Sequence, residues 1–272
     1  MSYVTAIVLA AGSGLRFSRL NSFTVRGGIP THISKMIKSG KSKIPKPLVK
    51  INSRPIIIYC LNILSRHAGI RDIIVVTNPK NLRGIISKIR QYRIDKISRI
   101  VQGGRRRQDS VLHALKAMDN RTDLVLIHDG ARPFIDKETV SSVIKEAERF
   151  GAAIVGVPVK ATIKKITKSL PRLRSGLPSV ARHHATGAFT VKETLDRRYL
   201  WEVQTPQVFK KELILKAYKR FGKSEVTDDA SLVEKLGVKV KIVKGSYSNI
   251  KITTPEDLIL AEAIAKRGLK RF

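Results

Sequence analysis

The chain has 272 residues, of which 42% are hydrophobic, and this apolar share is enough to bury a core and excludes wholesale disorder. Its length fits one large domain or two small ones. A formal net charge of +32 predicts attraction for anionic partners, a class that includes nucleic acids and phosphorylated small molecules. The single cysteine, Cys60, excludes an intramolecular disulfide and fits a reducing compartment.

The first predicted element is an apolar strand at Val4–Ala11. This run is too short to span a membrane and lacks a preceding basic region or a cleavage site, so we predict a cytoplasmic protein. Gly12 and Gly14 follow the strand and leave room for backbone N–H groups to approach phosphate oxygens, and Arg16 adds positive charge. Their spacing matches neither the dinucleotide-binding motif nor a Walker loop, so these residues alone leave a phosphate site and a plain turn open.

Two segments contain basic residues and no acidic residue. Residues 18–46 carry seven Lys/Arg, and residues 160–186 carry another seven. Both lie between better-patterned elements, and a solvated loop is as reasonable an interpretation as a functional insertion. Within "IPKPLVKI", Lys46 stands between two prolines, which restrict the backbone and hence the direction of its side chain.

Strand-like and helix-like segments alternate through the rest of the chain. Apolar, β-branched runs predict strands at 72–78, 123–127 (before a loop at 128–133), 151–159 and 238–243. Helical patterns lie at 56–67 with Pro55 in the first turn, and at 81–92, 107–118, 137–150, 211–221, 227–237 and 254–267. This rhythm predicts an α/β fold: a single Rossmann-like domain with a mostly parallel sheet and helices on both faces. The rhythm breaks at 160–200, which we interpret as an arm leaving the core or a disordered loop.

Two polar motifs lie where strands give way to loops. In "QGGRRRQDSV", Gly103 and Gly104 precede a helix start, and Ser110 could read a base edge or serve only as part of a capped loop. In "IHDGARPF", Asp129 stands at the carboxyl end of a strand, where ligands bind in open α/β sheets. Mg²⁺ takes one or two carboxylates together with phosphate oxygens, so Asp129 suits a metal bridging a triphosphate, with an ion pair to Arg132 as the alternative.

The order of these motifs resembles the nucleotidyltransferases that activate sugar and polyol phosphates. Within them, the chain is most similar to the 2-C-methyl-D-erythritol 4-phosphate cytidylyltransferase family of the non-mevalonate isoprenoid pathway. The resemblance covers nearly the whole chain, through "AAGSGLRF", "PKPL", "GGRRRQDSV", "HDGARPF", "LDRRYLWEVQTPQVF", "TDDASLVEKLG" and "NIKITTPEDL". The last three motifs are the more specific ones.

The resemblance implies transfer of CMP from CTP to the phosphate of 2-C-methyl-D-erythritol 4-phosphate, with Mg²⁺ or another divalent cation as cofactor. Arg16 and Lys46 would be catalytic, at the α-phosphate, and Asp129 would contact the metal. The residues implied to bind CTP are Ala10, Ala11, Gly12, Ser13, Gly14, Gly103, Gly104, Ser110 and Gly130. Those implied to bind the acceptor are Arg132, Arg197, Thr205, Thr227 and Lys251. Arg197 would come from an arm of the neighbouring subunit in a homodimer, so the predicted domain spans 1–272, with a dimerisation arm at 158–202.

Three features depart from the family pattern. Twenty-nine residues separate Arg16 from Lys46, where the family has fewer than ten, so a basic insertion at about 18–42 must return Lys46 to the pocket. "PKPL" replaces the commoner proline-lysine-glutamine pattern, and Ala161 stands where the family often has aspartate. The arm also carries an extra basic segment around 164–184.

Other functions remain as alternatives. A cytidylyltransferase acting on ribitol 5-phosphate shares most of the motifs. A uridylyl- or guanylyltransferase is further off, because the "QTPQ", "TDDAS" and "IKITTPEDL" set argues against it. The +32 charge also allows a nucleic-acid-binding protein on the same fold, although no helix-turn-helix, aromatic RNA-binding motif or zinc spacing supports it.

Overall fold

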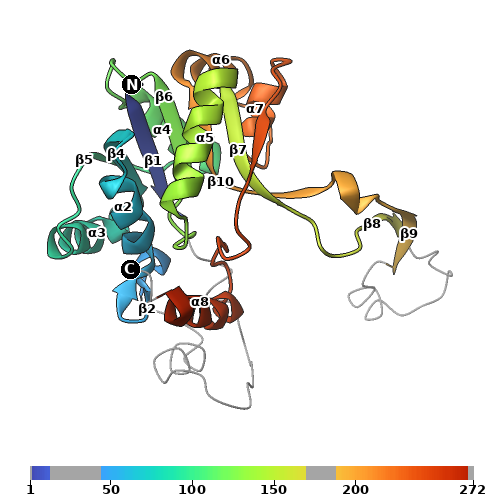
Figure 1. The fold of residues 1–272 in the computed structure, drawn as a ribbon, viewed down its shortest axis with the longest axis horizontal. Helices are drawn as coiled ribbons and strands as arrows, with labels where there is room; N and C mark the ends of the chain where they lie inside the picture. Colours follow the sequence, from blue (N-terminus) through green and yellow to red (C-terminus); the bar gives the residue numbers. More distant parts are fainter. Residues whose placement is uncertain (1, 13–43, 170–187, 269–272) are drawn as a thin grey trace, which may run out of the picture. The chain divides into compact units, whose positions relative to one another are not determined.

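The computed structural model describes residues 2–12, 44–169 and 188–268 (Figure 1). The chain divides into two compact units. The core unit comprises 1–156 and 203–272, and the arm unit comprises 157–202. Among the described residues, no helix is both long and apolar enough to cross a bilayer.

A seven-stranded sheet with the order β11-β7-β10-β6-β1-β4-β5 organises the core unit. Its strands are β1 (Val4–Ala10), β4 (Ile70–Thr77), β5 (Ile97–Gln102), β6 (Leu124–Asp129), β7 (Ala152–Pro158), β10 (Trp201–Lys210) and β11 (Lys241–Lys244). β1 pairs in parallel with both β4 and β6, β4 with β5, and β11 with β7, whereas β10 runs antiparallel to β6. The mostly parallel α/β sheet predicted from the sequence is confirmed.

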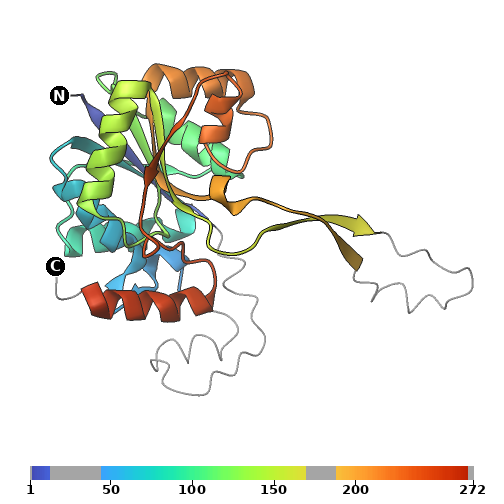
Figure 2. The ribbon, with the colours of Figure 1, turned by 45° about the vertical axis from the view of Figure 1, so that its right-hand side comes forward.

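Helices cover both faces of this sheet because alternate strand residues point to opposite sides. Ala6 and Val8 pack with α2 (Ile56–Arg66), α3 (Pro79–Gln91) and α5 (Lys137–Phe150). Ile7, between them, packs on the other side with α4 (Arg107–Lys116), α6 (Lys211–Phe221) and α7 (Ala230–Glu234). Figure 2 shows α5 lying along the sheet.

A smaller apolar cluster joins the C-terminal helix to the segment after Lys46. It connects α8 (Pro255–Gly268) with the two-stranded ribbon of β2 (Lys50–Ile51) and β3 (Arg54–Pro55), which follows the short 3-10 helix η1 (Lys46–Leu48). The Asp257 carboxylate accepts hydrogen bonds from the backbone N–H groups of Thr253 and Thr254, which fixes the start of α8. This packing holds η1 beside the sheet edge where β1 ends.

The predicted element bounds were accurate for α5 and α6 and less so elsewhere. Pro55 is the N-cap of α2 and not part of its first turn. The helix predicted at 227–237 is only the five residues Ala230–Glu234. β5 was not predicted, because this edge strand alternates poorly and most of its side chains are partly or fully exposed.

The arm unit contains a two-stranded antiparallel ribbon of β8 (Lys164–Ser169) and β9 (Ala188–Thr194), followed by the 3-10 helix η3 (Arg197–Tyr199). Ile166 pairs with Val191, and Phe189 lies two residues from Val191, so these three side chains share one face of the ribbon. All three are half-exposed or more in the isolated chain. The break in rhythm at 160–200 is therefore a ribbon in the described part.

Candidate active site

The carboxyl ends of β1, β5 and β6 meet at one edge of the sheet. The register pairs Leu9 of β1 with Asp129 of β6, and Ala10 of β1 with Thr77 of β4, so the loops that follow these strands start side by side. A cavity of about 520 Å³ lies at this edge. Its lining includes the predicted residues Ala10, Ala11, Gly12, Lys46, Gly104, Ser110, Asp129, Gly130 and Lys251.

Close packing between two loops shapes the cavity floor. A Cβ on Gly103 would lie 2.2 Å from the Cβ of Ala11, so only glycine allows the two loops to approach this closely. The Gly104 N–H donates to Ser110 Oγ at 3.0 Å, and that hydroxyl donates to the Arg106 carbonyl at 3.2 Å. Gly103 thus supports the cavity without lining it, and Ser110 holds the loop as well as lining the cavity.

Lys46 enters the cavity from η1, where it follows Pro45 and precedes the buried Pro47. The sequence predicted that the flanking prolines would direct this side chain, and the structure places it among the lining residues. Three further predicted residues, Ser13, Gly14 and Arg16, lie outside the described residues, as does the basic insertion at 18–42. Their roles stay predictions.

A second cavity, of about 390 Å³, adjoins the sheet on the side of β10. Four of the five residues predicted to bind the acceptor line it: Arg132, Thr205, Thr227 and Lys251. The fifth, Arg197, belongs to the arm unit, where its Nη1 donates to the Lys160 carbonyl at 2.6 Å. Three charged residues line both cavities, namely Arg107, Asp129 and Lys251.

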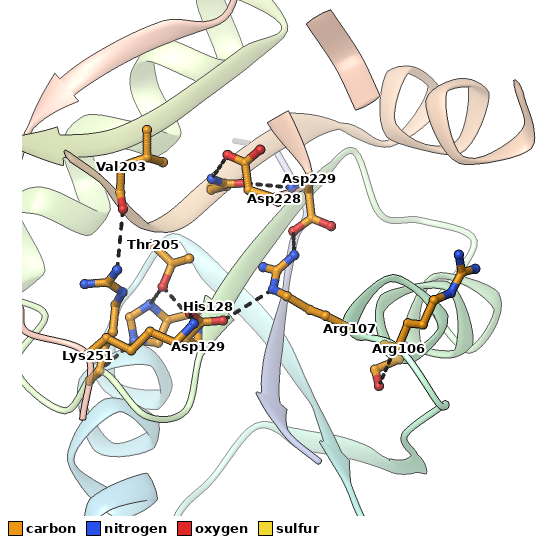
Figure 3. Close-up of polar contacts among 12 residues, drawn as sticks. Arg106, Arg107, His128, Asp129, Val203, Thr205, Asp228, Asp229 and Lys251 are labelled. Atoms are coloured by element: carbon orange, nitrogen blue, oxygen red, sulfur yellow. Dashed lines mark hydrogen bonds and ion pairs between the residues drawn. The ribbon is translucent and has the colours of Figure 1, made fainter. Parts of the chain in front are cut away.

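Asp129 is the centre of the charge arrangement (Figure 3). Its Oδ2 lies 2.7 Å from Lys251 Nζ, and its Oδ1 lies 3.6 Å from Arg107 Nε. Burial alone would raise the pKa of this carboxyl group, but Arg107 and Lys251 outweigh burial and hold the pKa well below its usual range. Asp129 is therefore a carboxylate at any physiological pH, and it balances two cations on the cavity walls.

A chain of hydrogen bonds fixes the backbone around Asp129. The Asp129 N–H donates to Thr205 Oγ1 at 3.0 Å, and the Thr205 hydroxyl donates to His128 Nδ1 at 3.1 Å, because the other ring nitrogen faces a carbonyl and carries the ring proton. His128 Nε2 then donates to the Arg132 carbonyl at 3.0 Å. Burial lowers the pKa of His128 to about 4, so the ring is neutral and this tautomer is maintained.

Arg132 lines the second cavity and holds neighbouring backbone segments together. Its guanidinium donates to the backbone carbonyls of Asn249, at 2.7 Å, and Val203, at 3.5 Å. The Asn249 side chain in turn donates to the Thr205 carbonyl. Arg132 therefore ties the "HDGARPF" loop to β10 and to the segment before α8, in addition to lining the cavity.

Sequence reasoning missed a polar network that forms part of the wall of the second cavity. Arg107 Nη1 donates to Asp229 Oδ2 at 2.7 Å, and Tyr218 donates to Asp229 Oδ1 at 2.5 Å. Gln207 accepts from the Asp229 N–H and donates to Asp228. The motifs "QTPQ" and "TDDAS" marked the region. No sequence signal separated Arg107 from the two arginines before it, because only the phase of α4 turns it inward.

The charge arrangement fits a metal ion that arrives with a nucleotide. In the described ranges no group of three or more His, Cys, Asp or Glu residues is placed to hold a metal. Asp129 is one ionised carboxylate at the junction of the two cavities. Mg²⁺ is typically bound by one or two carboxylates with phosphate oxygens and water completing its shell, and Asp129 is a carboxylate of the kind that such an ion needs.

Comparison with known proteins places this site in a family. The model of the 2-C-methyl-D-erythritol 4-phosphate cytidylyltransferase family matches residues 37–172 and 179–267. The chain belongs to this family. The chain is 39% identical over 267 residues to the 2-C-methyl-D-erythritol 4-phosphate cytidylyltransferase of Syntrophus aciditrophicus, covering 97% of this chain and 96% of that protein. It is 36% identical over 267 residues to the enzyme of the same name from Caldanaerobacter subterraneus, with 97% and 99% covered.

Solved structures agree with the family assignment. The crystal structure of 4-diphosphocytidyl-2C-methyl-D-erythritol synthase from Anaerococcus prevotii matches with a TM-score of 0.73 and 31% identity, covering 98% of this chain and 97% of that one. Membership of the cytidylyltransferase family confirms the resemblance found in the sequence, the fold class and the nucleotidyltransferase class of the enzyme.

Proposed function

We propose that this cytidylyltransferase moves CMP from CTP to the phosphate of 2-C-methyl-D-erythritol 4-phosphate and releases pyrophosphate. The observation that carries the proposal is the pair of adjoining cavities that share Arg107, Asp129 and Lys251. Two anionic ligands placed in these cavities meet at three charged side chains. Such a junction is what a transfer between two phosphates requires.

The nucleotide occupies the larger cavity in this proposal. The backbone of Ala10–Gly12 and the residues beyond it bind the CTP phosphates, and Lys46 with Arg16 stabilises charge on the α-phosphate. Gly104, Ser110 and Gly130 surround the cytosine, and Gly103 keeps that loop against Ala11. A +32 chain also favours anionic substrates during encounter, because a positive field raises their local concentration.

The acceptor occupies the smaller cavity. Thr205 and Thr227 face the polyol, and Lys251 contacts the acceptor phosphate from the wall it shares with the nucleotide cavity. Arg132 lines the same cavity and fixes its rim through backbone carbonyls. An acceptor bound between these groups lies beside the α-phosphate. Binding both substrates in this way makes a bimolecular reaction between two anions effectively unimolecular.

The chemistry needs charge neutralisation more than proton transfer. An oxygen of the acceptor phosphate attacks the α-phosphorus in line and forms a new P–O–P bond. The bond from the α-phosphorus to the bridging oxygen breaks, and pyrophosphate leaves with the electron pair. A phosphate dianion needs no general base, and the described lining of both cavities contains no histidine. Lys46, Arg16 and Lys251 cancel the repulsion between the two anions.

Asp129 would hold a divalent cation that enters with CTP. When bound, Mg²⁺ neutralises phosphate charge and orients the triphosphate. Asp129 contributes an ionised carboxylate that Arg107 and Lys251 keep at the junction, and His128 and Thr205 keep its backbone in place. Its low pKa keeps the carboxylate available across the physiological range.

We also propose a homodimer in which the arm of one copy completes the site of the other through Arg197. The apolar face formed by Ile166, Phe189 and Val191 supports an association, because exposed apolar patches on an isolated chain mark interaction surfaces. A two-stranded ribbon is only marginally stable by itself, which further favours a partner on this face.

The proposed reaction is tested by measuring pyrophosphate release from CTP with 2-C-methyl-D-erythritol 4-phosphate as acceptor. Parallel assays use ribitol 5-phosphate as acceptor, and UTP or ATP as the nucleotide. We expect the highest kcat/KM for CTP with methylerythritol phosphate. A preference for ribitol phosphate would replace the acceptor and keep the reaction class. Salt-sensitive binding of DNA or RNA with no pyrophosphate release would contradict the reaction itself.

A further inference from the structure

One arginine in a run of three is turned inward. Arg105 and Arg106 are exposed, and Arg106 pairs with Asp109 one turn along α4. All three line the first cavity, but of the three Arg107, the first residue of α4, also lines the second. If the two substrates meet as proposed above, the residues on both walls stand beside the reacting phosphates. Asp129 and Lys251 were expected there, whereas Arg107 has no role assigned so far.

Arg107 is held from behind by a buried carboxylate. Its Nη1 donates to Asp229 Oδ2 at 2.7 Å, and the Asp229 side chain is fully buried. Tyr218, from α6, donates to the other Asp229 oxygen at 2.5 Å. Gln207, from β10, accepts the Asp229 N–H at 3.2 Å. Tyr218 thus holds the carboxylate of Asp229 and Gln207 holds its backbone, and the carboxylate in turn fixes the guanidinium of Arg107.

The other edge of the guanidinium faces the reaction centre. Arg107 Nε lies 3.6 Å from Asp129 Oδ1, while Lys251 Nζ lies 2.7 Å from Asp129 Oδ2 (Figure 3). Asp129 is therefore held between two cations, one on each oxygen. The side chain of Lys251 is 42% exposed, and that of Arg107 is 28% exposed. Arg107 is the better anchored of the two cations, because it also pairs with the buried Asp229. Burial alone would lower the pKa of Arg107, but Asp229 and Asp129 raise it, so the group stays charged.

We propose that Arg107 is a positioning residue for the cytidylyl transfer, set by Asp229 and Tyr218, and that it holds the Asp129 carboxylate at the junction of the two cavities. The proposal rests on the proposed function. Tyr218 and Asp229 act through Arg107, and Arg107 acts through Asp129. A change at the Tyr218 hydroxyl therefore reaches the chemical step although Tyr218 lines neither cavity.

The geometry predicts a particular kinetic pattern. The loops expected to bind cytosine and the triphosphate are held by other contacts, such as Gly103 against Ala11 and Gly104 to Ser110. Loosening Arg107 should therefore lower kcat and leave the KM for CTP within about twofold. We expect a kcat about three- to tenfold lower for Tyr218→Phe. For Arg107→Lys we expect a kcat about ten- to a hundredfold lower, because lysine keeps the charge but lacks the planar fork that reaches two carboxylates.

The closing experiment measures pyrophosphate release by the full chain and its variants. It compares wild type, Tyr218→Phe, Arg107→Lys and the double variant, with Tm recorded for each. If both residues act through one path, Tyr218→Phe lowers kcat in the otherwise wild-type protein. The same substitution then lowers kcat little further when Arg107→Lys is already present. Matched controls are Tyr92→Phe, a partly buried tyrosine in the other apolar cluster, and Arg121→Lys, whose surface pair with Asp119 spans 2.9 Å. Both controls should keep the wild-type kcat.

Each result has a separate meaning. A wild-type kcat for folded Tyr218→Phe, or effects that multiply fully in the double variant, would overturn the positioning role. A fall in kcat that Tyr92→Phe reproduces would show a general loss of rigidity and overturn it as well. A wild-type protein that releases no pyrophosphate would overturn the proposed function instead. Asp229→Asn is a further variant, but the buried carboxylate it removes also supports folding, so Tyr218→Phe and Arg107→Lys carry the test.

Discussion

The core unit buries three clusters of apolar side chains, whereas the described ribbon of the arm unit leaves Ile166 50%, Val191 56% and Phe189 65% exposed. Charged groups follow the same division. Arg107 pairs with the fully buried Asp229 in the core, but Arg198 and Asp196 in the arm form a 2.6 Å pair with side chains 79% and 43% exposed. A buried pair fixes geometry strongly, while a surface pair contributes little.

This difference separates two ways of building a site. The core can arrange Lys46, Asp129 and Lys251 within one chain, because packed helices and buried hydrogen bonds hold their elements in place. In the described residues of the arm, the apolar side chains of the ribbon and the charged pairs lie at the surface, so we expect the contribution of Arg197 to depend on what covers that apolar face. Changes in the core should therefore act within each chain, and changes in the arm should act through association.

Lys46 provides the largest expected effect and tests the core. Lys46→Ala removes a positive charge from the cavity wall, and we expect kcat to fall by about 10² to 10³, equivalent to about 2.7–4 kcal/mol of transition-state stabilisation. Tm should stay close to that of the wild type. The measurement is pyrophosphate release at saturating CTP, with the exposed Lys50→Ala as the control. Turnover at the wild-type level in Lys46→Ala would remove Lys46 from the mechanism.

Arg197 tests whether the arm acts on a neighbouring copy. We expect Arg197→Ala to lower kcat/KM for the acceptor by on the order of 10², because it removes a cation from the acceptor phosphate. Mixing it with Lys46→Ala should then restore activity. A mixed dimer has one site with both an intact Lys46 and an intact arm, so random exchange returns about a quarter of the wild-type rate.

The mixture discriminates between two arrangements. If Arg197 served the site of its own chain, both sites of a mixed dimer would carry one defect, and the mixture would stay as slow as its components. Equal amounts of the two variants are incubated until subunits exchange, and pyrophosphate release is followed over time. Exchange is verified by tagging one variant and recovering the other with it.

Sequence reasoning was most accurate where local signals and packing agree. Asp136 caps α5 by accepting the Thr139 N–H, and Gly151 ends that helix with a φ of 88°, so both ends were visible as residue types. β5 had no such signal, because none of its side chains is fully buried and the strand is defined by its pairing with β4. Its existence follows from tertiary packing.

The same distinction applies to the site. The loops after β1 and β6 were predictable because ligands bind at the carboxyl ends of parallel strands. The role of Arg107 was not, because three adjacent arginines are equivalent in a sequence and only the α4 packing selects one. His128 was likewise visible only as part of "HDGARPF", since its hydrogen bond to Thr205 joins two residues that are brought together by the antiparallel β10.

His128 makes the stability of the core depend on pH. Its folded pKa is about 4, below the ordinary value of 6.5, so between these two values the unfolded chain binds a proton that the folded chain does not. The free energy of unfolding should therefore fall as the pH decreases, by about 2 kcal/mol between pH 7.5 and pH 5. Urea titration at both pH values measures this change.

Substitution isolates the histidine from other acid-sensitive groups. His128→Gln should be less stable than the wild type at pH 7.5 but should lose about 2 kcal/mol less between the two pH values. His113→Gln, at an exposed histidine, should keep the wild-type dependence. The Asp129 carboxylate acts at lower pH, because its folded pKa is depressed and its stabilisation is lost only below the ordinary carboxyl pKa. An unchanged pH dependence in His128→Gln would show that burial does not keep this ring neutral.

Val191 gives the smallest expected effect and tests the arm directly. Val191→Ala removes two carbons from the apolar face of the ribbon, which corresponds to about 1–2 kcal/mol if that face is covered in a dimer. The dimer dissociation constant should then rise by about tenfold, measured by sedimentation over a range of concentrations. Thr190→Ala is the matched control, because Thr190 pairs with Thr167 on the opposite face of the same ribbon. If both variants shift the dissociation constant equally, the ribbon has no preferred face. If neither does, the exposed side chains of the arm are not what joins two copies, and the contrast with the core would have to rest on Arg197 alone.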